Sequence, residues 1–367
     1  RVPIPALWIE ELDVSLEQLA YDAFDFDAKS YPDKLLYADC QLREDPKPQR
    51  NTFPSLARMV SDGNYRIGIF VGYDKDRWLT PNYRRVYHDV FNALRRLGLT
   101  APGVRVFDDL KNVGANPLTR TVRRDAKRWV TIEVELHHHN WRTPEANEAL
   151  VTRLMHQSDV FWYIGHGGLD GRLYLDKDRQ VFVDELYRSS IYGRESAQQL
   201  FVIAACETVG NYADRLYDKT AKTRETLDVI SGAGVLQKDS LQWTDELIPL
   251  KTVSRQVWQQ TDGLIPERVT TSKTYLDALS YAEILEHNAF RASDRFVVEG
   301  DEDNRLIGHP FADFTRVGAQ CRYDDDCGNP GGNRCLGHRC AAVTIGSCPP
   351  QTKLLGHSGL QLFCGAR

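Results

Sequence analysis

Six of the eight cysteines lie within the last 47 of the 367 residues, and this clustering constrains the fold more than any other feature of the sequence. The surrounding segment is rich in Gly, Asp and Asn and is too short to bury a hydrophobic core, the situation in which small domains depend on disulfides. We therefore expect a small C-terminal module with three disulfides among Cys321, Cys327, Cys335, Cys340, Cys348 and Cys364. Cys40 and Cys206 lie far from this group.

A zinc site is the alternative for these cysteines. Successive cysteines are separated by 5, 7, 4, 7 and 15 residues, so the CxxC pairs typical of structural zinc sites are missing. Disulfides are therefore favoured, and they persist in oxidising compartments. We expect a secreted or periplasmic protein, and the start at Arg1 without a hydrophobic leader indicates a mature or trimmed form.

The composition excludes two classes of protein. With 42% hydrophobic and 26% charged residues, the chain is typical of a water-soluble globular protein. Its longest apolar runs fall far short of the roughly 20 residues that span a bilayer. A net charge of -5 provides no overall positive field for nucleic acid or anionic lipid. The sequence leaves the oligomeric state open.

Short apolar runs alternate with helical patterns between about residues 64 and 300. The runs at 160–168, 199–207 and 228–235 are almost continuously apolar, as strands buried on both faces are. Shorter runs at 66–73 and 104–110 flank a helical pattern at 83–99, which ends at Gly98 and has an apolar stripe of Val86, Val90, Phe91, Leu94 and Leu97. This alternation predicts an α/β fold with a mainly parallel sheet between helices.

Three regions follow from these patterns. Residues 1–63, with a helical stretch at 9–24 and prolines between 46 and 54, are predicted to form an extension or strap. Residues 64–315 are predicted to form the α/β domain, and residues 316–367 the Cys-rich module.

Two of the apolar runs end in reactive side chains, His166 and Cys206. The carboxyl ends of parallel strands share one edge of a sheet, where ligands bind. A cysteine and a histidine at this edge can act as a catalytic pair, in which the thiolate attacks a substrate carbonyl and the imidazole transfers the proton. The N–H groups of Gly167 and Cys206 are candidates for the oxyanion hole. Each residue alone is more often structural, but their equivalent positions favour a catalytic pair.

The blocks YIGHGG and VIAACE resemble the caspase, legumain and gingipain superfamily of cysteine peptidases, in which apolar blocks end in His-Gly and Ala-Cys. The segments GHGGLDGRLYLD and AACET are most similar to the legumain family. The resemblance covers about residues 64–250. It implies a caspase-hemoglobinase-like three-layer sandwich and an endopeptidase that cleaves proteins or peptides through a thioester on the cysteine.

An Asn-Tyr-Arg triplet at 82–84 also resembles the legumain family. The resemblance implies that Asn82 orients the catalytic histidine and that Arg84 enters the specificity pocket. The same triplet occurs at 64–66, so it carries little weight alone.

The chain departs from the legumain pattern at Ala204, where that family has a glutamate that lines the primary specificity pocket. A methyl group neither hydrogen-bonds a substrate amide nor pairs with a basic side chain. Other residues must then provide selectivity, and the candidates are Asp170, Asp239, Ser240, Trp243 and Asp245. Each acid among them is more often a solvated loop residue.

Metal sites are weakly indicated, and no cofactor is expected. His137, His138 and His139 lack the HExxH spacing, so a surface or edge position is favoured. The acidic runs 301–303 and 324–326 do not fit the twelve-residue calcium loop, which leaves calcium as a minor alternative.

The predicted function is therefore a secreted cysteine endopeptidase with a Cys206–His166 dyad. One alternative is a catalytically inactive relative that binds a ligand through the Cys-rich tail. A transpeptidase with the same dyad is another. The sequence leaves open the substrate preference and whether the chain is a zymogen activated by cleavage.

Overall fold

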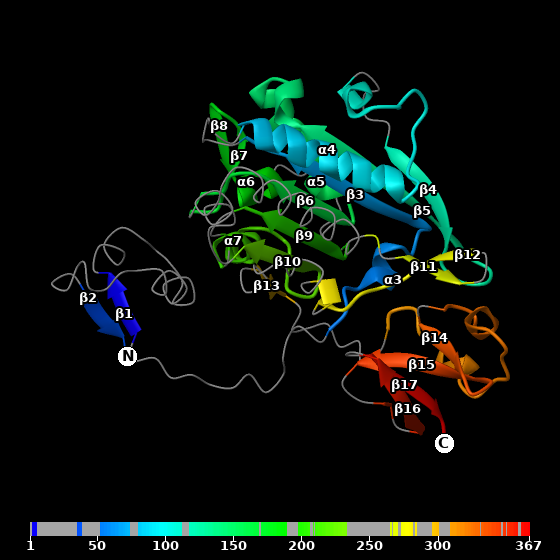
Figure 1. The fold of residues 1–367 in the computed structure, drawn as a ribbon. Coiled ribbons are helices and arrows are strands. Elements are labelled where there is room, and N and C mark those ends of the chain that lie inside the picture. Colours follow the sequence, from blue (N-terminus) through cyan, green and yellow to red (C-terminus); the bar gives the residue numbers. More distant parts are fainter. Residues whose placement is uncertain are drawn as a thin grey trace, which may run out of the picture.

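The computed structural model describes residues 2–5, 35–38, 52–73, 80–111, 117–168, 170–188, 197–205, 208, 210–232, 265, 267–270, 273–281, 283–284, 296–300, 309–330, 332–345, 348–349, 351–358 and 361–367 (Figure 1). For some of these, including 80–86, the backbone alone is described. Near the N-terminus, β1 (Val2–Pro5) pairs antiparallel with β2 (Leu35–Ala38). The helical stretch expected at 9–24 lies outside the described residues.

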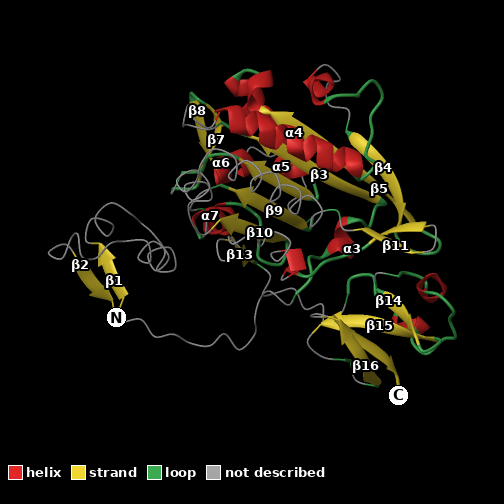
Figure 2. Ribbon diagram, in the orientation of Figure 1, coloured by secondary structure: helices red, strands yellow, loops and turns green. Residues whose placement is uncertain are grey.

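A nine-stranded sheet forms the centre of the molecule (Figure 2). In spatial order its strands are β11 (Glu267–Thr270), β12 (Lys273–Leu276), β4 (Leu118–Arg123), β5 (Trp129–His138), β3 (Asn64–Val71), β6 (Val160–Ile164), β9 (Gln199–Ala204), β10 (Leu227–Gly232) and β13 (Phe296–Glu299). The five strands from β5 to β10 run parallel, and β4 and β13 flank them in antiparallel orientation. The predicted mainly parallel α/β sheet is confirmed.

Helices cover both faces of this sheet because its central strands are apolar on both sides. One face packs against α3 (Leu56–Met59) and α4 (Thr80–Arg96) through a core that includes Trp162. The other packs against α5 (Pro144–Gln157), α6 (Val183–Arg188) and α7 (Asn211–Lys219) through a core that includes Phe161. Adjacent residues of β6 thus serve opposite cores, as strand geometry requires.

Helix α4 matches the helical pattern seen in the sequence. Val90, Phe91 and Leu94 are buried against the sheet, and Leu97 packs at the margin of the same core. Gly98 follows the helix with φ +78°, the left-handed conformation expected of a C-terminal cap.

The apolar run at 104–110 is not a strand, contrary to the sequence-based expectation. It contains the 3-10 helix η3 (Phe107–Lys111). The carboxylate of Asp109 accepts hydrogen bonds from the main-chain N–H groups of Arg105 (2.7 Å) and Val106 (2.9 Å). These local bonds hold the segment in a turn and prevent it from pairing with a sheet.

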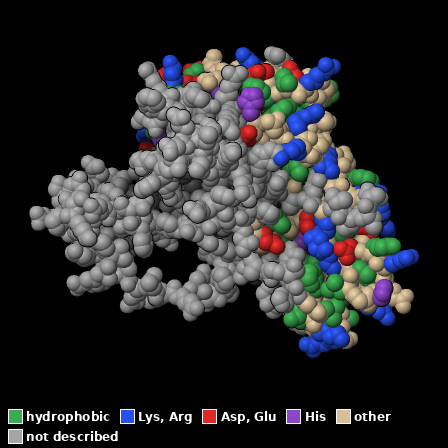
Figure 3. Space-filling view, viewed as in Figure 1, with side chains coloured by type: hydrophobic (Ala, Val, Ile, Leu, Met, Phe, Trp, Pro, Cys, Tyr) green, Lys and Arg blue, Asp and Glu red, His purple; other side chains and the backbone are tan. Residues whose placement is uncertain are grey.

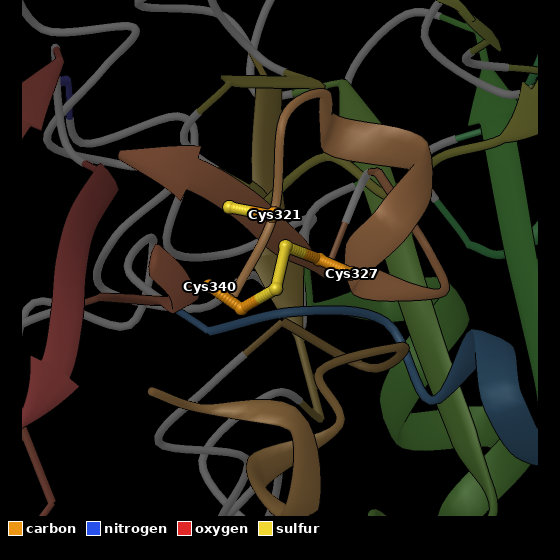
Figure 4. Close-up of side chains that lie close together, drawn as sticks. All are labelled: Cys321, Cys327 and Cys340. Atoms are coloured by element: carbon orange, nitrogen blue, oxygen red, sulfur yellow. A yellow bond between two sulfur atoms is a disulfide. The ribbon is translucent and has the colours of Figure 1, made fainter. Parts of the chain in front are cut away.

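The C-terminal module contains a four-stranded antiparallel sheet with the order β14 (Asn333–Leu336), β15 (Arg339–Ile345), β17 (Gln361–Ala366) and β16 (Thr352–Ser358). Three disulfides link Cys321 to Cys335, Cys327 to Cys340 and Cys348 to Cys364. Figure 4 shows the Cys327–Cys340 bond with Cys321 beside it. The prediction of three disulfides within this group is confirmed, whereas Cys40 and Cys206 lie outside the described residues.

A buried hydrogen bond between His309 and Asp277 joins the module to the sheet domain. His309 Nε2 donates to Asp277 Oδ1 at 2.7 Å, and His309 Nδ1 accepts the Phe311 N–H at 3.1 Å. Burial alone raises the pKa of Asp277, but the hydrogen bond from His309 and the nearby Arg268 outweigh it and lower that pKa to about 2. The main-chain N–H of His309 donates to the main-chain carbonyl of Val343 in β15. His309 is therefore bonded both to the sheet domain, through Asp277, and to the module, through Val343.

Residues 52–60 belong to the main core, although they fall within the predicted extension of residues 1–63. Phe53, Met59 and Val60 are buried with the sheet residues of the same face. The main-chain carbonyl of Thr52 accepts the Tyr281 N–H at 2.9 Å. None of the described helices is long and apolar enough to cross a membrane.

Candidate active site

The candidate site lies at the edge of the sheet where the parallel strands end. Ile164, the last residue of β6, is paired with Val71 of β3 and with Ala204 of β9. His166 follows Ile164 by two residues, and Cys206 follows Ala204 by two residues. The strand register therefore aligns the starting points of the two predicted catalytic segments. Cys206 itself lies outside the described residues.

The turn that carries His166 is held by contacts with Tyr73, Tyr163 and Tyr174, which lie in or next to three strands. The His166 N–H donates to Tyr73 at 3.2 Å, just beyond β3. The buried Tyr163 hydroxyl donates to the His166 carbonyl at 2.7 Å. Tyr174 in β7 (Arg172–Asp176) contributes an edge-on ring contact to the His166 imidazole, with 4.6 Å between the ring centroids. The imidazole is half-buried, and it has a defined place at the sheet edge.

Gly167 brings the histidine turn against the segment that precedes Cys206. A Cβ atom on Gly167 would lie 3.0 Å from Ala205 Cβ, 3.3 Å from Thr208 Cγ2 and 2.7 Å from the Tyr212 hydroxyl. Such distances leave no room for a side chain, so the close approach requires glycine. Ala205 and Thr208 are the residues on either side of Cys206 and Glu207 in the sequence. The described structure therefore brings together the His-Gly turn and both flanks of the Ala-Cys segment.

The N–H of Gly167 has no hydrogen-bond acceptor within the described part of the chain. Its neighbours are satisfied, because the His166 N–H donates to Tyr73 and the Gly168 N–H donates to Arg172 at 2.8 Å. Gly167 lies opposite Leu173 in an isolated antiparallel bridge whose hydrogen bonds are made by these flanking residues. A buried main-chain N–H without an acceptor is uncommon, and oxyanion holes are built from such donors.

Thr208 fixes the far flank of the Cys206 segment. Its hydroxyl accepts the Gly232 N–H at 2.7 Å, and its own N–H donates to the Gly232 carbonyl at 2.7 Å. Thr208 is fully buried, and Gly232 ends the neighbouring strand β10. The segment after β9 is thereby bonded to the next strand of the sheet.

Helix α7 follows the Cys206 segment and contacts the histidine turn, a connection that the sequence did not reveal. The Tyr212 hydroxyl donates to the carbonyl oxygens of Arg172 (2.5 Å) and Gly168 (3.3 Å). Arg215 Nε donates to the Asp170 carbonyl at 2.7 Å, and its guanidinium also pairs with Asp184 at 3.0 Å. A sequence signal that could have indicated these roles is the amphipathic pattern of residues 211–219, directly after the Cys206 segment.

The structure describes only some of the residues that were predicted to select the substrate or orient the histidine. The exposed Asp170 lies just past the histidine turn, and its carboxylate pairs with Arg172 at 3.1 Å. Asn82 and Arg84 lie in the first turns of α4, where the backbone alone is described. The remaining candidates lie outside the described residues: Asp239, Ser240, Trp243 and Asp245.

The three consecutive histidines are buried at the end of β5, an inner strand of the sheet, so the surface or edge position favoured from the sequence is wrong. His137, His138 and His139 are 3%, 8% and 5% exposed. Burial lowers the pKa of His137, although a hydrogen bond to Glu135 (3.0 Å) opposes the effect. Burial also lowers the pKa of His139 to about 4. Both imidazoles are therefore neutral at physiological pH.

The other metal candidates engage in internal bonds. Asp324 accepts the Cys335 N–H at 2.8 Å, and Asp326 accepts two N–H groups at the start of the 3-10 helix η8 (Asp324–Cys327). The acidic run 301–303 lies outside the described residues. The sulfurs of Cys321, Cys327 and Cys340 lie within 4.8 Å of one another, but all three atoms are oxidised in disulfides. In this form they do not provide the thiolates that zinc requires.

Comparisons with known proteins do not identify a family for this chain. No protein-family model matches it, and no curated protein sequence matches it.

Proposed function

We propose that this chain is a cysteine endopeptidase of the caspase-hemoglobinase fold, with Cys206 as nucleophile and His166 as general acid and base. One observation carries the proposal: Gly167, next to His166, packs against Ala205, next to Cys206, at the carboxyl edge of the parallel sheet. The motif resemblance to legumain-like peptidases supports the same pair.

In the proposed mechanism, the Cys206 thiolate attacks the peptide carbonyl, and the resulting oxyanion receives hydrogen bonds from the Gly167 and Cys206 N–H groups. The C–N bond then breaks, and the protonated His166 gives its proton to the leaving amine. A water molecule, deprotonated by His166, attacks the thioester and releases the carboxylic acid and the thiol. The Gly167 N–H, which has no acceptor among the described residues, supports this role for Gly167.

Substrate selection is proposed to depend on residues other than position 204. Ala204 contributes a methyl group, which neither pairs with a charge nor donates a hydrogen bond. Asp170, the described candidate, is exposed beside the histidine turn, and its pairing with Arg172 lowers its availability to a basic substrate residue. The roles of Arg84, Asp239, Ser240, Trp243 and Asp245 remain part of this proposal.

A secreted or periplasmic location is proposed on the strength of the three disulfides, because reducing compartments do not sustain such bonds. A transpeptidase would use the same thioester and pass the acyl group to an amine. Mass analysis of the products from a peptide plus an added amine separates hydrolysis from transfer.

The test is covalent labelling with a peptidyl acyloxymethyl ketone, which alkylates an activated cysteine with loss of the carboxylate. We expect a single label on Cys206 and no label on the Cys206→Ala or His166→Ala variants. Hydrolysis of a fluorogenic peptide library should be lost in both variants, while their melting temperatures stay close to that of the parent. Absence of labelling in the folded parent would contradict the proposal and favour a non-catalytic binding protein.

A further inference from the structure

A cavity of about 540 Å³ lies between the β4–β5 hairpin turn and the C-terminal module. We call it the hairpin–module cavity. Its walls come from three segments: residues 124–128 of the hairpin turn, residues 310–314 together with Arg316, and residues 328–329. This volume lies within the usual range for small-ligand sites, about 300–1,000 Å³. Figure 3 shows Lys and Arg side chains close to the boundary between the sheet and the module.

The hairpin turn and the C-terminal module, which form opposite walls of the cavity, are directly bonded to each other. The side-chain amide of Asn329 donates to the main-chain carbonyl of Arg124, across 205 positions of sequence. The guanidinium of Arg124 lies over the ring of Phe311, 5.3 Å from its centroid. Lys273 of β12 forms an ion pair with Asp325 at 3.7 Å and adds a third link between the parts. The cavity is therefore a defined feature of the junction.

The charge of the cavity is positive and largely uncompensated. Among the described residues, Arg124, Lys127 and Arg316 form no ion pair, whereas the fourth cation, Arg128, is paired with Asp125 at 2.5 Å. Burial and the neighbouring Arg128 lower the pKa of Arg124, and the nearby Asp125 only partly offsets this shift.

The one remaining acid of the lining does not balance these cations. Asp313 uses its Oδ1 atom to accept hydrogen bonds from the N–H and the hydroxyl of Thr315 at the start of the 3-10 helix η7 (Phe314–Arg316). Arg124, Lys127 and Arg316 thus line a space whose two carboxylates are already engaged, Asp125 in an ion pair and Asp313 in hydrogen bonds. A bound anion would relieve their mutual repulsion.

Aromatic surface accompanies the positive charge. Phe314 is 45% exposed although it lines the cavity, and Phe311 forms a buried wall beside it. Ligand sites combine apolar and aromatic lining with a few polar groups, and the Phe314 ring supplies such a surface beside the cations. A ligand for this site therefore combines several negative groups with an apolar side chain.

We propose that the hairpin–module cavity binds an acidic peptide segment of a partner protein, with carboxylates on Arg124, Lys127 and Arg316 and an apolar side chain on Phe314. Charge complementarity and the adjoining aromatic surface favour this occupant over a sulfated polysaccharide, which lacks the apolar group. The proposal does not depend on the peptidase function.

The cavity is remote from the candidate active site. It adjoins the start of β5, whereas His166 lies beyond the opposite end of the parallel strands. Strand β5 has 10 residues, and at about 3.3 Å per residue the two edges are roughly 30 Å apart. A peptide held here engages a region separate from the bond that would be cleaved.

The test is fluorescence anisotropy of the full chain with the labelled peptide Gly-Asp-Glu-Phe-Glu-Asp. We expect saturable binding that weakens as NaCl is raised from 50 to 200 mM, since the contacts are partly exposed. The Arg124→Gln/Arg316→Gln variant should raise the Kd at least 10-fold, and Phe314→Ser should raise it several-fold. Arg179→Gln removes an arginine that pairs with Glu148 at 2.5 Å outside the cavity, so it should leave the Kd unchanged.

A second charge variant and a neutral peptide complete the test. Since Arg124 is half-buried, the Lys127→Gln/Arg316→Gln variant, which changes exposed side chains only, tests the same charges without disturbing the junction. The neutral peptide Gly-Asn-Gln-Phe-Gln-Asn should not bind. The proposal is overturned by equal binding of the neutral peptide, by an unchanged Kd in the charge variants, or by binding of a heparin hexasaccharide in place of the acidic peptide.

Discussion

The Tyr212 hydroxyl lies 2.5 Å from the carbonyl oxygen of Arg172 and so bonds helix α7 to the turn that carries His166. Tyr212 is fully buried and follows Cys206 by six residues. The same side chain thus connects the two segments that the proposed chemistry requires.

Tyr212→Phe should lower kcat about 10-fold or more, because small displacements of reacting groups cost up to about 100-fold. The lost hydrogen bonds should also reduce stability by about 1–2 kcal/mol. Tyr217→Phe is the matched control, since the Tyr217 hydroxyl on the same helix donates to two main-chain carbonyls, of Leu227 (3.0 Å) and Glu299 (3.3 Å), away from the turn. Equal kcat losses in both variants would contradict a specific role for Tyr212.

Gly167→Ala should reduce both activity and stability, because the new methyl group would lie 2.7 Å from the Tyr212 hydroxyl and 3.0 Å from Ala205 Cβ. Overpacking of this kind costs about 1–3 kcal/mol. In the Tyr212→Phe background the stability loss should be smaller, which a double-mutant cycle measures by denaturant unfolding. Strict additivity would mean that the two residues do not touch.

Asn82→Ala should lower the hydrolysis rate roughly 10–100-fold if Asn82 orients the His166 imidazole, at the lower end of general acid–base effects. Asn64→Ala is its control, because the second Asn-Tyr-Arg triplet begins β3 at the opposite edge of the sheet. There Arg66 pairs with Asp62 at 2.8 Å. Equal rates for the Asn82 variant and the parent would show that the first triplet is accidental.

Glu299 should make stability fall as the pH rises. Burial raises the pKa of this carboxyl to about 7, although the Gly210 N–H opposes the shift by donating to it at 3.2 Å. Because the folded-state pKa lies above the usual 4.5, the stabilisation is complete below about pH 4.5 and is lost as the pH rises through 7.

Glu299→Gln, which stays neutral, should flatten the dependence of unfolding free energy on pH and exceed the parent at pH 8 by about 1–3 kcal/mol. Asp214→Asn removes the nearby carboxylate that also raises this pKa, so it should shift the midpoint downward. An unchanged slope between pH 5 and 8 in Glu299→Gln would exclude this carboxyl as its source.

Mass mapping of the non-reduced protein should find Cys321–Cys335, Cys327–Cys340 and Cys348–Cys364 with Cys206 as a free thiol. Each bond should contribute about 2–4 kcal/mol to the module, so reduction should unfold the module while the α/β sheet domain persists. Peptide hydrolysis should then continue in mild reductant. A disulfide that includes Cys206 in active protein would exclude it as nucleophile.

The sequence predicted the features that depend on burial. Runs such as Val160–Ile164 are apolar because both of their faces are covered, and the side chains that end them mark the sheet edge. It did not predict β4, whose half-buried and exposed polar residues interrupt the apolar pattern. The run at 104–110 was wrongly predicted because a single carboxylate, Asp109, decides its conformation.

The links that hold the candidate site together were beyond sequence reasoning. Tyr212 and Arg172 are 40 residues apart, and no local pattern shows which buried hydroxyl meets which carbonyl. The disulfide pairing was open for a related reason, since six cysteines allow 15 arrangements. Long-range contacts of this kind depend on the complete fold.

The buried pair of His309 and Asp277 has a consequence for how the two parts of the chain come apart. His309 is the first described residue after 300, and it is anchored in the sheet domain as well as in the module. A protease nick between 300 and 309 would therefore leave two fragments that stay associated and copurify. Acid would weaken this association, because protonation of Asp277 as the pH falls from about 4 toward 2 removes the charge that holds the imidazole, while the Asn329–Arg124 hydrogen bond remains.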